Sequence, residues 1–239
     1  MRTTSIKAYL KTKLDKDGFF YYCLLLLKRK PISFPLFFLY SLWLSKKLTG
    51  LWWPIKIRFS GKFIPVKISA KRANVVAKGN LIIESWQNGD NSILISLGEN
   101  SILTIEGNFT IGQGVKISVG PNATLRLGGQ LLSSGSGITC DTMIMASKSI
   151  EIGKDVIIAW GVYITDSDWH TIEGRDMISP VFIGNNVWIS HDVSVLKGTS
   201  IGQGSIIGAK SLVVGNIPEN CLAAGIPAKI IHKNVAWTR

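Results

Sequence analysis

The chain has 239 residues and a formal net charge of +12, from 27 Lys and Arg residues against 15 Asp and Glu residues. This length is enough for one elongated domain and an appendage. Three scattered cysteines, Cys23, Cys140 and Cys221, argue against a disulfide framework or a cysteine-based metal site, and they favour a reducing cytoplasm.

The positive charge is concentrated at the N-terminus. Residues 1–72 hold 16 Lys and Arg against 2 Asp and Glu, a balance of +14, whereas residues 73–239 hold 11 against 13, a balance of −2. We therefore assign residues 1–61 to a basic, hydrophobic N-terminal arm, which we predict to be helical.

Two long apolar runs lie in this arm, at residues 19–27 and 32–44, and a basic cluster at residues 28–30 separates them. Neither run reaches the roughly 20 apolar residues that a membrane-spanning helix needs, and the cluster would be costly inside a bilayer. No small-residue cleavage site follows and the second run contains Pro35, so we do not expect a signal peptide.

Trp43, Trp52 and Trp53 accompany the basic residues of the arm. Aromatic and basic side chains together are typical of a segment in the headgroup region of an anionic cytoplasmic leaflet, which predicts a cytoplasmic protein that is peripheral to the inner membrane. In the alternative interpretation, the arm caps the following domain or packs between subunits, and its charge is a solvated face.

A six-residue period follows short β-rich pieces at about residues 62–91. It begins at Leu103 (LTIEGN), is interrupted at residues 121–124, and continues to Ser167 with Gly137 as one extra residue. It then covers residues 181–216 (VFIGNN to SLVVGN), where the third position of every hexad is aliphatic: Ile183, Ile189, Val195, Ile201, Ile207 and Val213.

Six residues suit one short strand and a bend, and such a unit buries its apolar side only by stacking on a copy of itself. Gly184, Gly202 and Gly208 stand where a bend needs a residue without a Cβ atom. We predict an all-β protein, a triangular parallel β-helix over residues 62–220, followed by a C-terminal turn and tail over residues 221–239.

One long excursion, residues 168–180 (DWHTIEGRDMISP), leaves the repeat. Loops that project from a rigid scaffold are where function concentrates. This loop carries His170, with Asp166 and Asp168 just before it. An imidazole accepts a proton near neutral pH and a neighbouring carboxylate can hold its tautomer, which makes His170 a candidate general base. The alternative is a surface histidine in a polar loop.

Residues 184–231 resemble the C-terminal half of hexapeptide-repeat acyltransferases. The resemblance rests on the repeats, on Asn-Val-Trp-Ile at residues 186–189, and on Asn-Ile-Pro followed by Ala-Gly-Ile-Pro-Ala-Lys within residues 216–229. It is greatest to galactoside, maltose and serine acetyltransferases and to O-acetyltransferases of bacterial surface polysaccharides. It covers roughly residues 100–232 and leaves the arm uncovered.

The resemblance implies a left-handed coil and a homotrimer with active sites in the clefts between subunits. It also implies acetyl-coenzyme A as co-substrate and no metal. His170 would remove the proton of an acceptor hydroxyl as that oxygen attacks the thioester, without an acyl-enzyme. Asp168 or Asp166 would orient the imidazole or bind a sugar hydroxyl, and a donor near Ser190 and His191 would stabilise the oxyanion.

The resemblance further implies an acetyl-coenzyme A groove. His191 stands near the thiol end, Trp188 beside the acetyl group or as an anchor for the loop, and Lys229 at the nucleotide phosphates. At positions 214 and 215 this chain lacks the Thr-Lys pair of many relatives, which leaves only backbone contacts there. The full predicted set is Trp188, Ser190, His191, Gly208, Ala209, Val214, Gly215, Lys229 and His232.

The predicted acceptor is a sugar hydroxyl of a polysaccharide precursor, and the arm favours a lipid-linked glycan. Asp166, Tyr163 and Trp169 are the candidate acceptor residues, and Trp160 is a further aromatic that could stack on a sugar ring. The alternative acceptor is a soluble small molecule.

Two other classes of protein remain as alternatives. One is a noncatalytic β-helix scaffold or a carbonic anhydrase on the same prism, which the spacing of only three histidines disfavours. The other is a nucleic-acid binder, which the arm disfavours because its charge alternates with aliphatic runs and lacks polar recognition residues.

Overall fold

The computed structural model describes residues 34–60, 63–85, 91–130 and 135–238. The chain divides into two compact units, residues 1–41 and 42–239. The helix α3 (Phe34–Thr49) confirms a helical arm. The apolar run at residues 19–27 and the basic cluster at 28–30 lie outside the described residues. In the described ranges, no helix has the length and hydropathy needed to cross a bilayer.

The end of α3 follows from local chemistry. Lys46 and Lys47 occupy its last turn, where positive charge complements the helix dipole. Gly50 then adopts a left-handed conformation, with φ of 78°, and its N–H donates to the Lys46 carbonyl at 2.8 Å. Glycine reaches this conformation without steric cost and is therefore the common residue just past a helix.

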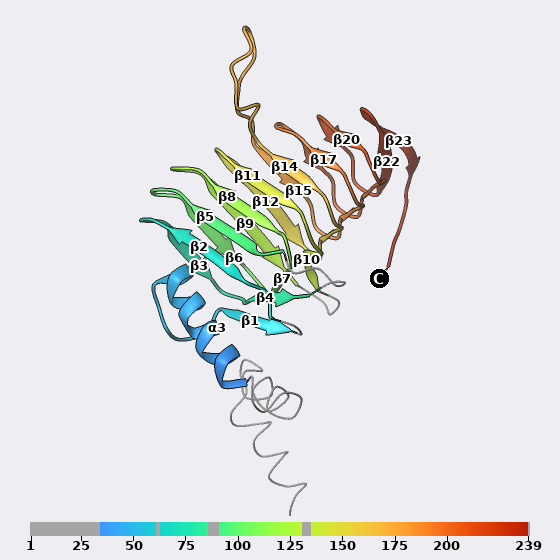
Figure 1. Cartoon of the computed structure of the whole chain (residues 1–239). Helices are drawn as coiled ribbons and strands as arrows, with labels where there is room; N and C mark the ends of the chain where they lie inside the picture. Colours follow the sequence, from blue (N-terminus) through green and yellow to red (C-terminus); the bar gives the residue numbers. More distant parts are fainter. Residues whose placement is uncertain (1–33, 61–62, 86–90, 131–134, 239) are drawn as a thin grey trace, which may run out of the picture. The chain divides into compact units, whose positions relative to one another are not determined.

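The second unit contains a parallel β-helix with three faces, A, B and C (Figure 1). Each strand pairs in parallel with the strand three positions later in the chain, such as β1 with β4. The last pair is the exception, because β23 runs antiparallel to β22. The predicted parallel β-helix is therefore confirmed. Its first strand begins at Ile57, inside the segment assigned to the arm.

Successive strands along the chain belong to faces A, B and C in turn. Face A contains β1 (Ile57–Ser60), β4 (Leu81–Glu84), β7 (Phe109–Gly112), β10 (Ser136–Ile138), β13 (Ile157–Ile158), β16 (Trp188–Ile189), β19 (Ile206–Ile207), β22 (Cys221–Gly225) and β23 (Ala228–Lys233). Face B contains β2 (Val66–Ala70), β5 (Ile93–Leu97), β8 (Lys116–Val119), β11 (Met143–Ala146), β14 (Tyr163–Thr165), β17 (Ser194–Val195) and β20 (Leu212–Val213). Face C contains β3 (Asn74–Ala77), β6 (Ile102–Ile105), β9 (Thr124–Gly129), β12 (Ser149–Lys154), β15 (Val181–Ile183), β18 (Ser200–Ile201) and β21 (Asn216–Ile217).

The core is the inside of the prism. Side chains alternate between the two sides of a strand, so the third residue of each hexad points inward. All six such residues of the second repeat block are fully buried: Ile183, Ile189, Val195, Ile201, Ile207 and Val213. The register predicted from the hexads is therefore correct, and residues at the alternate positions form the outer surface.

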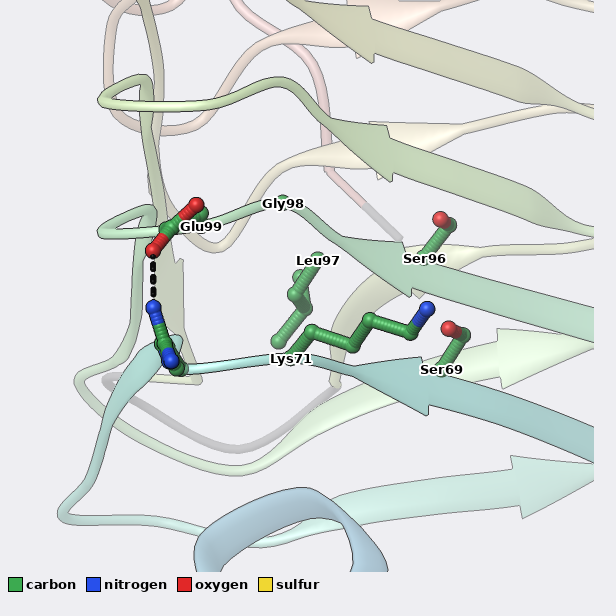
Figure 2. Close-up of a pocket in the computed structure, with 7 residues that line it drawn as sticks. Ser69, Lys71, Ser96, Leu97, Gly98 and Glu99 are labelled. Atoms are coloured by element: carbon green, nitrogen blue, oxygen red, sulfur yellow. Dashed lines mark hydrogen bonds and ion pairs between the residues drawn. The ribbon is translucent and has the colours of Figure 1, made fainter.

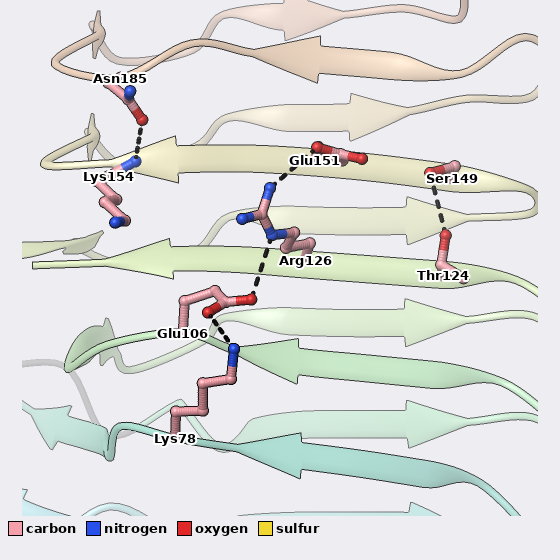
Figure 3. Close-up of polar contacts among 8 residues, drawn as sticks. All are labelled: Lys78, Glu106, Thr124, Arg126, Ser149, Glu151, Lys154 and Asn185. Atoms are coloured by element: carbon pink, nitrogen blue, oxygen red, sulfur yellow. Dashed lines mark hydrogen bonds and ion pairs between the residues drawn. The ribbon is translucent and has the colours of Figure 1, made fainter.

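Charged side chains cross-link coils on the outside of face C (Figure 3). Lys78 lies 3.0 Å from Glu106, and Arg126 lies 3.5 Å from Glu106 and 3.4 Å from Glu151. The hydrogen bond from Lys78 lowers the pKa of Glu106, helped by Arg126 and opposed by partial burial. These pairs are exposed to solvent, so they contribute modestly to stability and chiefly disfavour a shifted register.

Two edges of the prism carry most of the residues singled out in the sequence. Edge AB is where the chain bends from face A to face B, after β4, β7, β10, β13, β16 and β19. Edge BC is where it bends from face B to face C, after β2, β5, β8, β11, β14, β17 and β20.

Candidate active site

A single long loop, residues 166–180, leaves the prism at edge BC between β14 and β15 and projects beyond the neighbouring bends (Figure 1). Its two legs are joined by backbone bonds from Asp168 N–H to the Met177 carbonyl and from Ser179 N–H to the Asp166 carbonyl, each 2.9 Å. At the tip, Arg175 N–H donates to the Ile172 carbonyl at 3.0 Å, closing a tight turn.

Asp166 anchors the base of this loop. Its side chain is fully buried, and its carboxylate accepts the backbone N–H groups of Ser147, Lys148 and Ser149 at 2.6, 2.7 and 2.7 Å. Both oxygens are therefore engaged by the preceding coil. This geometry corrects the prediction that Asp166 binds the acceptor or orients His170, because a buried carboxylate held by three amides is available for neither.

Lys197 holds the two legs of the loop together. Its Nζ lies 2.7 Å from Asp168 Oδ2, and it also donates to the carbonyl of Asp176. Asp168 is therefore paired with Lys197 within one chain. His170 is exposed, and within the described ranges of a single chain no hydrogen bond or ion pair engages its imidazole.

Two of the predicted acceptor residues meet at the root of the loop. Trp169 Nε1 donates to the Tyr163 hydroxyl at 3.2 Å, and 46% of Trp169 is exposed. Tyr163 lies on β14, on the outside of face B. The pair presents an aromatic surface with a hydroxyl group beside the loop that carries His170.

Most of the predicted cofactor residues lie on face A and edge AB. Trp188 on β16 shares one cross-strand column with Ile206, Leu222 and His232. Lys229 on β23 is opposite Ala224 of β22. A Cβ atom at Gly208 would lie 2.7 Å from the Ala224 Cβ, so the backbone packs closely there. Ser190 and His191 follow β16 at edge AB, and exposed Ala209 follows β19 at the same edge.

Val214 and Gly215 lie elsewhere. They follow β20 at edge BC, and the Gly215 carbonyl accepts the Ser200 N–H at 3.0 Å. They therefore share an edge with the projecting loop, while Ala209 and His191 occupy the other edge of face B. Within one chain the structure divides the predicted site into two halves.

Sequence reasoning missed several contacts around these halves. The Trp160 ring stacks on His191, with centroids 5.3 Å apart and 9° between planes, and His191 Nδ1 lies 3.1 Å from Asp192 Oδ2. Trp237 of the tail donates its Nε1 hydrogen to the Asn186 carbonyl at 3.0 Å and tilts against Trp188 at 5.9 Å. No sequence signal marks the two ring pairs, because their members are 31 and 49 residues apart.

Two surface hollows among the described residues lie away from both halves of the predicted catalytic and cofactor residues. A shallow hollow of about 660 Å³ lies at the first two coils on face B, lined by Ser69, Lys71, Arg72, Ser96, Leu97, Gly98 and Glu99 (Figure 2). The Arg72–Glu99 ion pair, 2.7 Å long, closes one side. A second hollow of about 300 Å³ lies at edge AB and the adjoining part of face B, lined by Asn91, Ser92, Leu94, Gly114, Lys116, Asp141, Thr142 and Met143. Neither contains a predicted catalytic residue.

The sequence and the fold are similar to those of known proteins. The sequence profile for the bacterial transferase hexapeptide (six repeats) matches residues 180–215. The Escherichia coli protein WbbJ, named as a lipopolysaccharide biosynthesis O-acetyl transferase, is 39% identical over 140 residues, which cover 53% of this chain and 69% of that protein. A Mycobacterium tuberculosis protein named as an acetyltransferase is 35% identical over 131 residues, 51% of this chain and 44% of that one.

A solved structure shows the same fold. The polySia-specific acetyltransferase NeuO superimposes with a TM-score of 0.53 at 26% identity, covering 74% of this chain and 89% of that one. The chain thus spans just over two thirds of the Escherichia coli relative and less than half of the Mycobacterium relative.

Proposed function

Because the chain belongs to the hexapeptide-repeat acyltransferases, with their left-handed β-helix, we propose that it transfers an acetyl group from acetyl-coenzyme A to a sugar hydroxyl of a bacterial surface-polysaccharide precursor. The names of two relatives support this acceptor class, since one is named for lipopolysaccharide biosynthesis and the other for polysialic acid.

The observation that carries the proposal is the division of the site between two edges. The loop with His170 and the Val214–Gly215 bend lie at edge BC, whereas His191, Ala209 and Lys229 lie at edge AB and on face A. Face B separates these edges, so the two halves meet only when edge BC of one subunit faces edge AB of another. A closed ring of identical subunits repeats this contact, and the ring in this proposal is a homotrimer.

The chemistry is then a direct transfer. The His170 imidazole removes the acceptor hydroxyl proton while the oxygen attacks the thioester carbonyl. Collapse of the tetrahedral intermediate breaks the carbon–sulfur bond, and the leaving thiolate takes the proton back from the imidazolium. A donor at the Ser190–His191 bend stabilises the oxyanion. Asp168, held by Lys197, positions the loop that carries the base.

Acetyl-coenzyme A fits along the second half. The nucleotide phosphates lie against Lys229 and His232, where a cation complements phosphate charge. The pantetheine arm passes Gly208 and Ala209, where small side chains leave the backbone of edge AB accessible. The thioester reaches Trp188 and His191. The Val214–Gly215 bend of the adjoining subunit contributes backbone groups from its edge BC.

The acceptor sugar occupies the surface beside the loop. The Trp169–Tyr163 pair offers a ring face and a hydroxyl group there. Recognition of a sugar combines such an aromatic surface with a few placed polar groups. A soluble small molecule remains the alternative acceptor, and a comparison of turnover on lipid-linked and free glycans separates the two.

We further propose that the arm holds this reaction at the cytoplasmic surface of the inner membrane. Leu51, Trp52 and Trp53, just after α3, are 61%, 51% and 57% exposed. Lys46 Nζ stands 4.5 Å from the centroid of the Trp52 ring. Exposed tryptophans beside lysines are the side chains that anchor a protein at an anionic lipid interface.

The test of the proposed function is replacement of His170. His170→Ala should lower kcat by roughly 10²- to 10⁴-fold, the share that a positioned general base contributes. The trimer mass and the KM for acetyl-coenzyme A should stay unchanged. Glu173→Ala, an exposed substitution in the turn of the same loop, is the matched control. Full turnover by the His170 variant would remove the imidazole from the mechanism.

A further inference from the structure

Edge AB forms one continuous ladder from the second hollow to His191. Backbone N–H groups of Gly114, Asp141, Gly161 and Asp192 donate to the carbonyls of the preceding bends at 2.9–3.2 Å: Asn91, Gln113, Cys140 and Trp160. Neighbouring parallel strands lie 4.7–4.9 Å apart, so the four steps from Asn91 to His191 span about 19 Å. This length accommodates several sugar residues in a row.

The proposed acetyl-coenzyme A occupies only the C-terminal part of this edge. It extends from His191 past Ala209 towards Lys229. The acceptor must meet the thioester at His191, because the attacking oxygen has to touch the carbonyl carbon. The proposed cofactor leaves the N-terminal part of edge AB free, so a long acceptor can extend from Trp160 towards Asn91 along the cleft.

Trp160 stands where that path begins. One face of its ring is covered by the His191 ring, and 47% of its surface is still exposed. The Asp192 contact to Nδ1 and the stacking on Trp160 both orient the His191 ring. The open aromatic face has a negative quadrupole that suits the C–H face of a pyranose ring.

The second hollow continues the path on the N-terminal side of Trp160. Its volume is about 300 Å³, in the lower range of small-molecule sites. Asp141 Oδ1 accepts a hydrogen bond from Asn91 Nδ2 at 3.1 Å, so a carboxylate and an amide converge at its mouth. Lys116 contributes an exposed ammonium group from face B, and Met143 an apolar floor. Acceptors and donors around a partly apolar hollow suit sugar hydroxyls.

We propose that edge AB from Trp160 to Asn91 is a distal subsite for an oligosaccharide acceptor, so that the enzyme prefers several linked sugars over a single one. The proposal rests on the proposed acetyl transfer and adds the class of acceptor. The reacting sugar lies at His191, and the sugars before it stack on Trp160 and bond to the polar groups of the second hollow.

The experiment uses the full-length protein and the surface polysaccharide of the organism that makes it. The polysaccharide is de-O-acetylated, cut by mild acid and separated into fractions of one repeat unit and of six or more. Wild type should show a lower KM for the long fraction. Trp160→Ala should raise the KM for the long fraction about tenfold, consistent with one lost aromatic stack. Lys116→Ala, which is remote from His191, should also raise the KM for the long fraction, and it should leave the KM for the single repeat and for acetyl-coenzyme A unchanged.

Lys116→Ala is a second variant on the exposed side of face B, which tests the subsite even when Trp160→Ala disturbs folding. Trp160→Phe keeps an aromatic face and should retain the length preference. Phe182→Ala is the matched control, because Phe182 is 48% exposed on face C, away from edge AB.

The outcomes are distinct. If wild type acetylates neither fraction, the proposed function itself fails. If wild type acetylates both with the same KM, the distal subsite is wrong and the acetyl transfer stands. A loss in Trp160→Ala that is equal for both lengths, or an unchanged KM for the long fraction in Lys116→Ala, would overturn the subsite.

Discussion

Single residues in the loop have separate duties that the sequence pattern does not distinguish. Asp166 and Asp168 both precede His170. The buried Asp166 carboxylate accepts hydrogen bonds from three backbone N–H groups, whereas Asp168 forms an ion pair with Lys197. One carboxylate fixes where the loop leaves the prism, and the other joins its legs. The position of His170 therefore depends on two carboxylates that need not touch it.

Replacing Asp166 tests this division of duties. Asp166→Ala removes the buried acceptor of three part-buried hydrogen bonds, and should lower the free energy of unfolding by about 3 kcal/mol. Asp168→Ala, two residues away, removes a partly exposed ion pair and should cost about 1 kcal/mol or less. Urea denaturation at one protein concentration measures both. Equal losses in the two variants would contradict the anchoring role of Asp166.

At the scale of elements, the stacking distance of the coils is set where face C meets face A. A Cβ atom at Gly153 would lie 2.6 Å from the carbonyl carbon of Gly184, and one at Gly184 would lie 2.7 Å from the Gln203 nitrogen. These separations are shorter than any normal contact. The glycines at this bend therefore allow the coils to approach to β-sheet spacing, which the aliphatic interior then maintains.

The prediction at this scale concerns Gly153. Gly153→Ala should destabilise the prism by about 3 kcal/mol, because the methyl group meets backbone that cannot move aside. Gly174→Ala is the control, since its site is open space and only the left-handed φ of 71° is unfavourable, at about 1–2 kcal/mol. Thermal unfolding followed by circular dichroism compares them. A Gly153 variant as stable as the Gly174 variant would show that the bend is compliant.

At the scale of the whole molecule, the proposed active site is complete only in the proposed homotrimer. His170 and Lys229 of one chain lie on different sides of face B. The net charge is also unevenly distributed along the chain: it is +14 in residues 1–72 and −2 in residues 73–239. This uneven distribution supports the proposed contact of the N-terminal residues with an anionic membrane surface.

Mixing two inactive variants tests the shared site. Co-expressed His170→Ala and Lys229→Glu chains form mixed trimers in which some clefts combine an intact loop with an intact groove. Random assembly at equal amounts should restore about a quarter of wild-type activity. Each variant alone, at the same total concentration, gives the baseline. Without recovery in mixed trimers of verified composition, the site would lie within one chain.

Vesicle sedimentation tests the membrane surface. A Trp52→Ala, Trp53→Ala double variant of the full chain should bind vesicles containing phosphatidylglycerol roughly tenfold more weakly, because two interfacial anchors are lost. Binding should also fall with added salt. Trp169→Ala, an exposed tryptophan on the loop, serves as the control. Wild-type binding to neutral and anionic vesicles alike would contradict an electrostatic contribution from the arm.

The sequence by itself determined the prism. Inward and outward positions alternate along each strand, so a six-residue period in residues 181–216 was enough to identify the buried column and the faces. The same periodicity exposed the one long loop, because a break in a regular repeat is visible without coordinates. The resemblance then supplied the expected role of His170.

Only the tertiary structure decided which distant residues meet. Trp160 and Tyr163 are three residues apart, yet the bend at Gly161 places them at edge AB and on face B, a separation that the sequence does not reveal. Asp168 meets Lys197 because the loop returns to the edge from which it left, and Lys197 lies in the next bend at that edge. Which residues meet between coils depends on the lengths of all the insertions and bends that lie between them in the chain. A local sequence pattern does not contain this information.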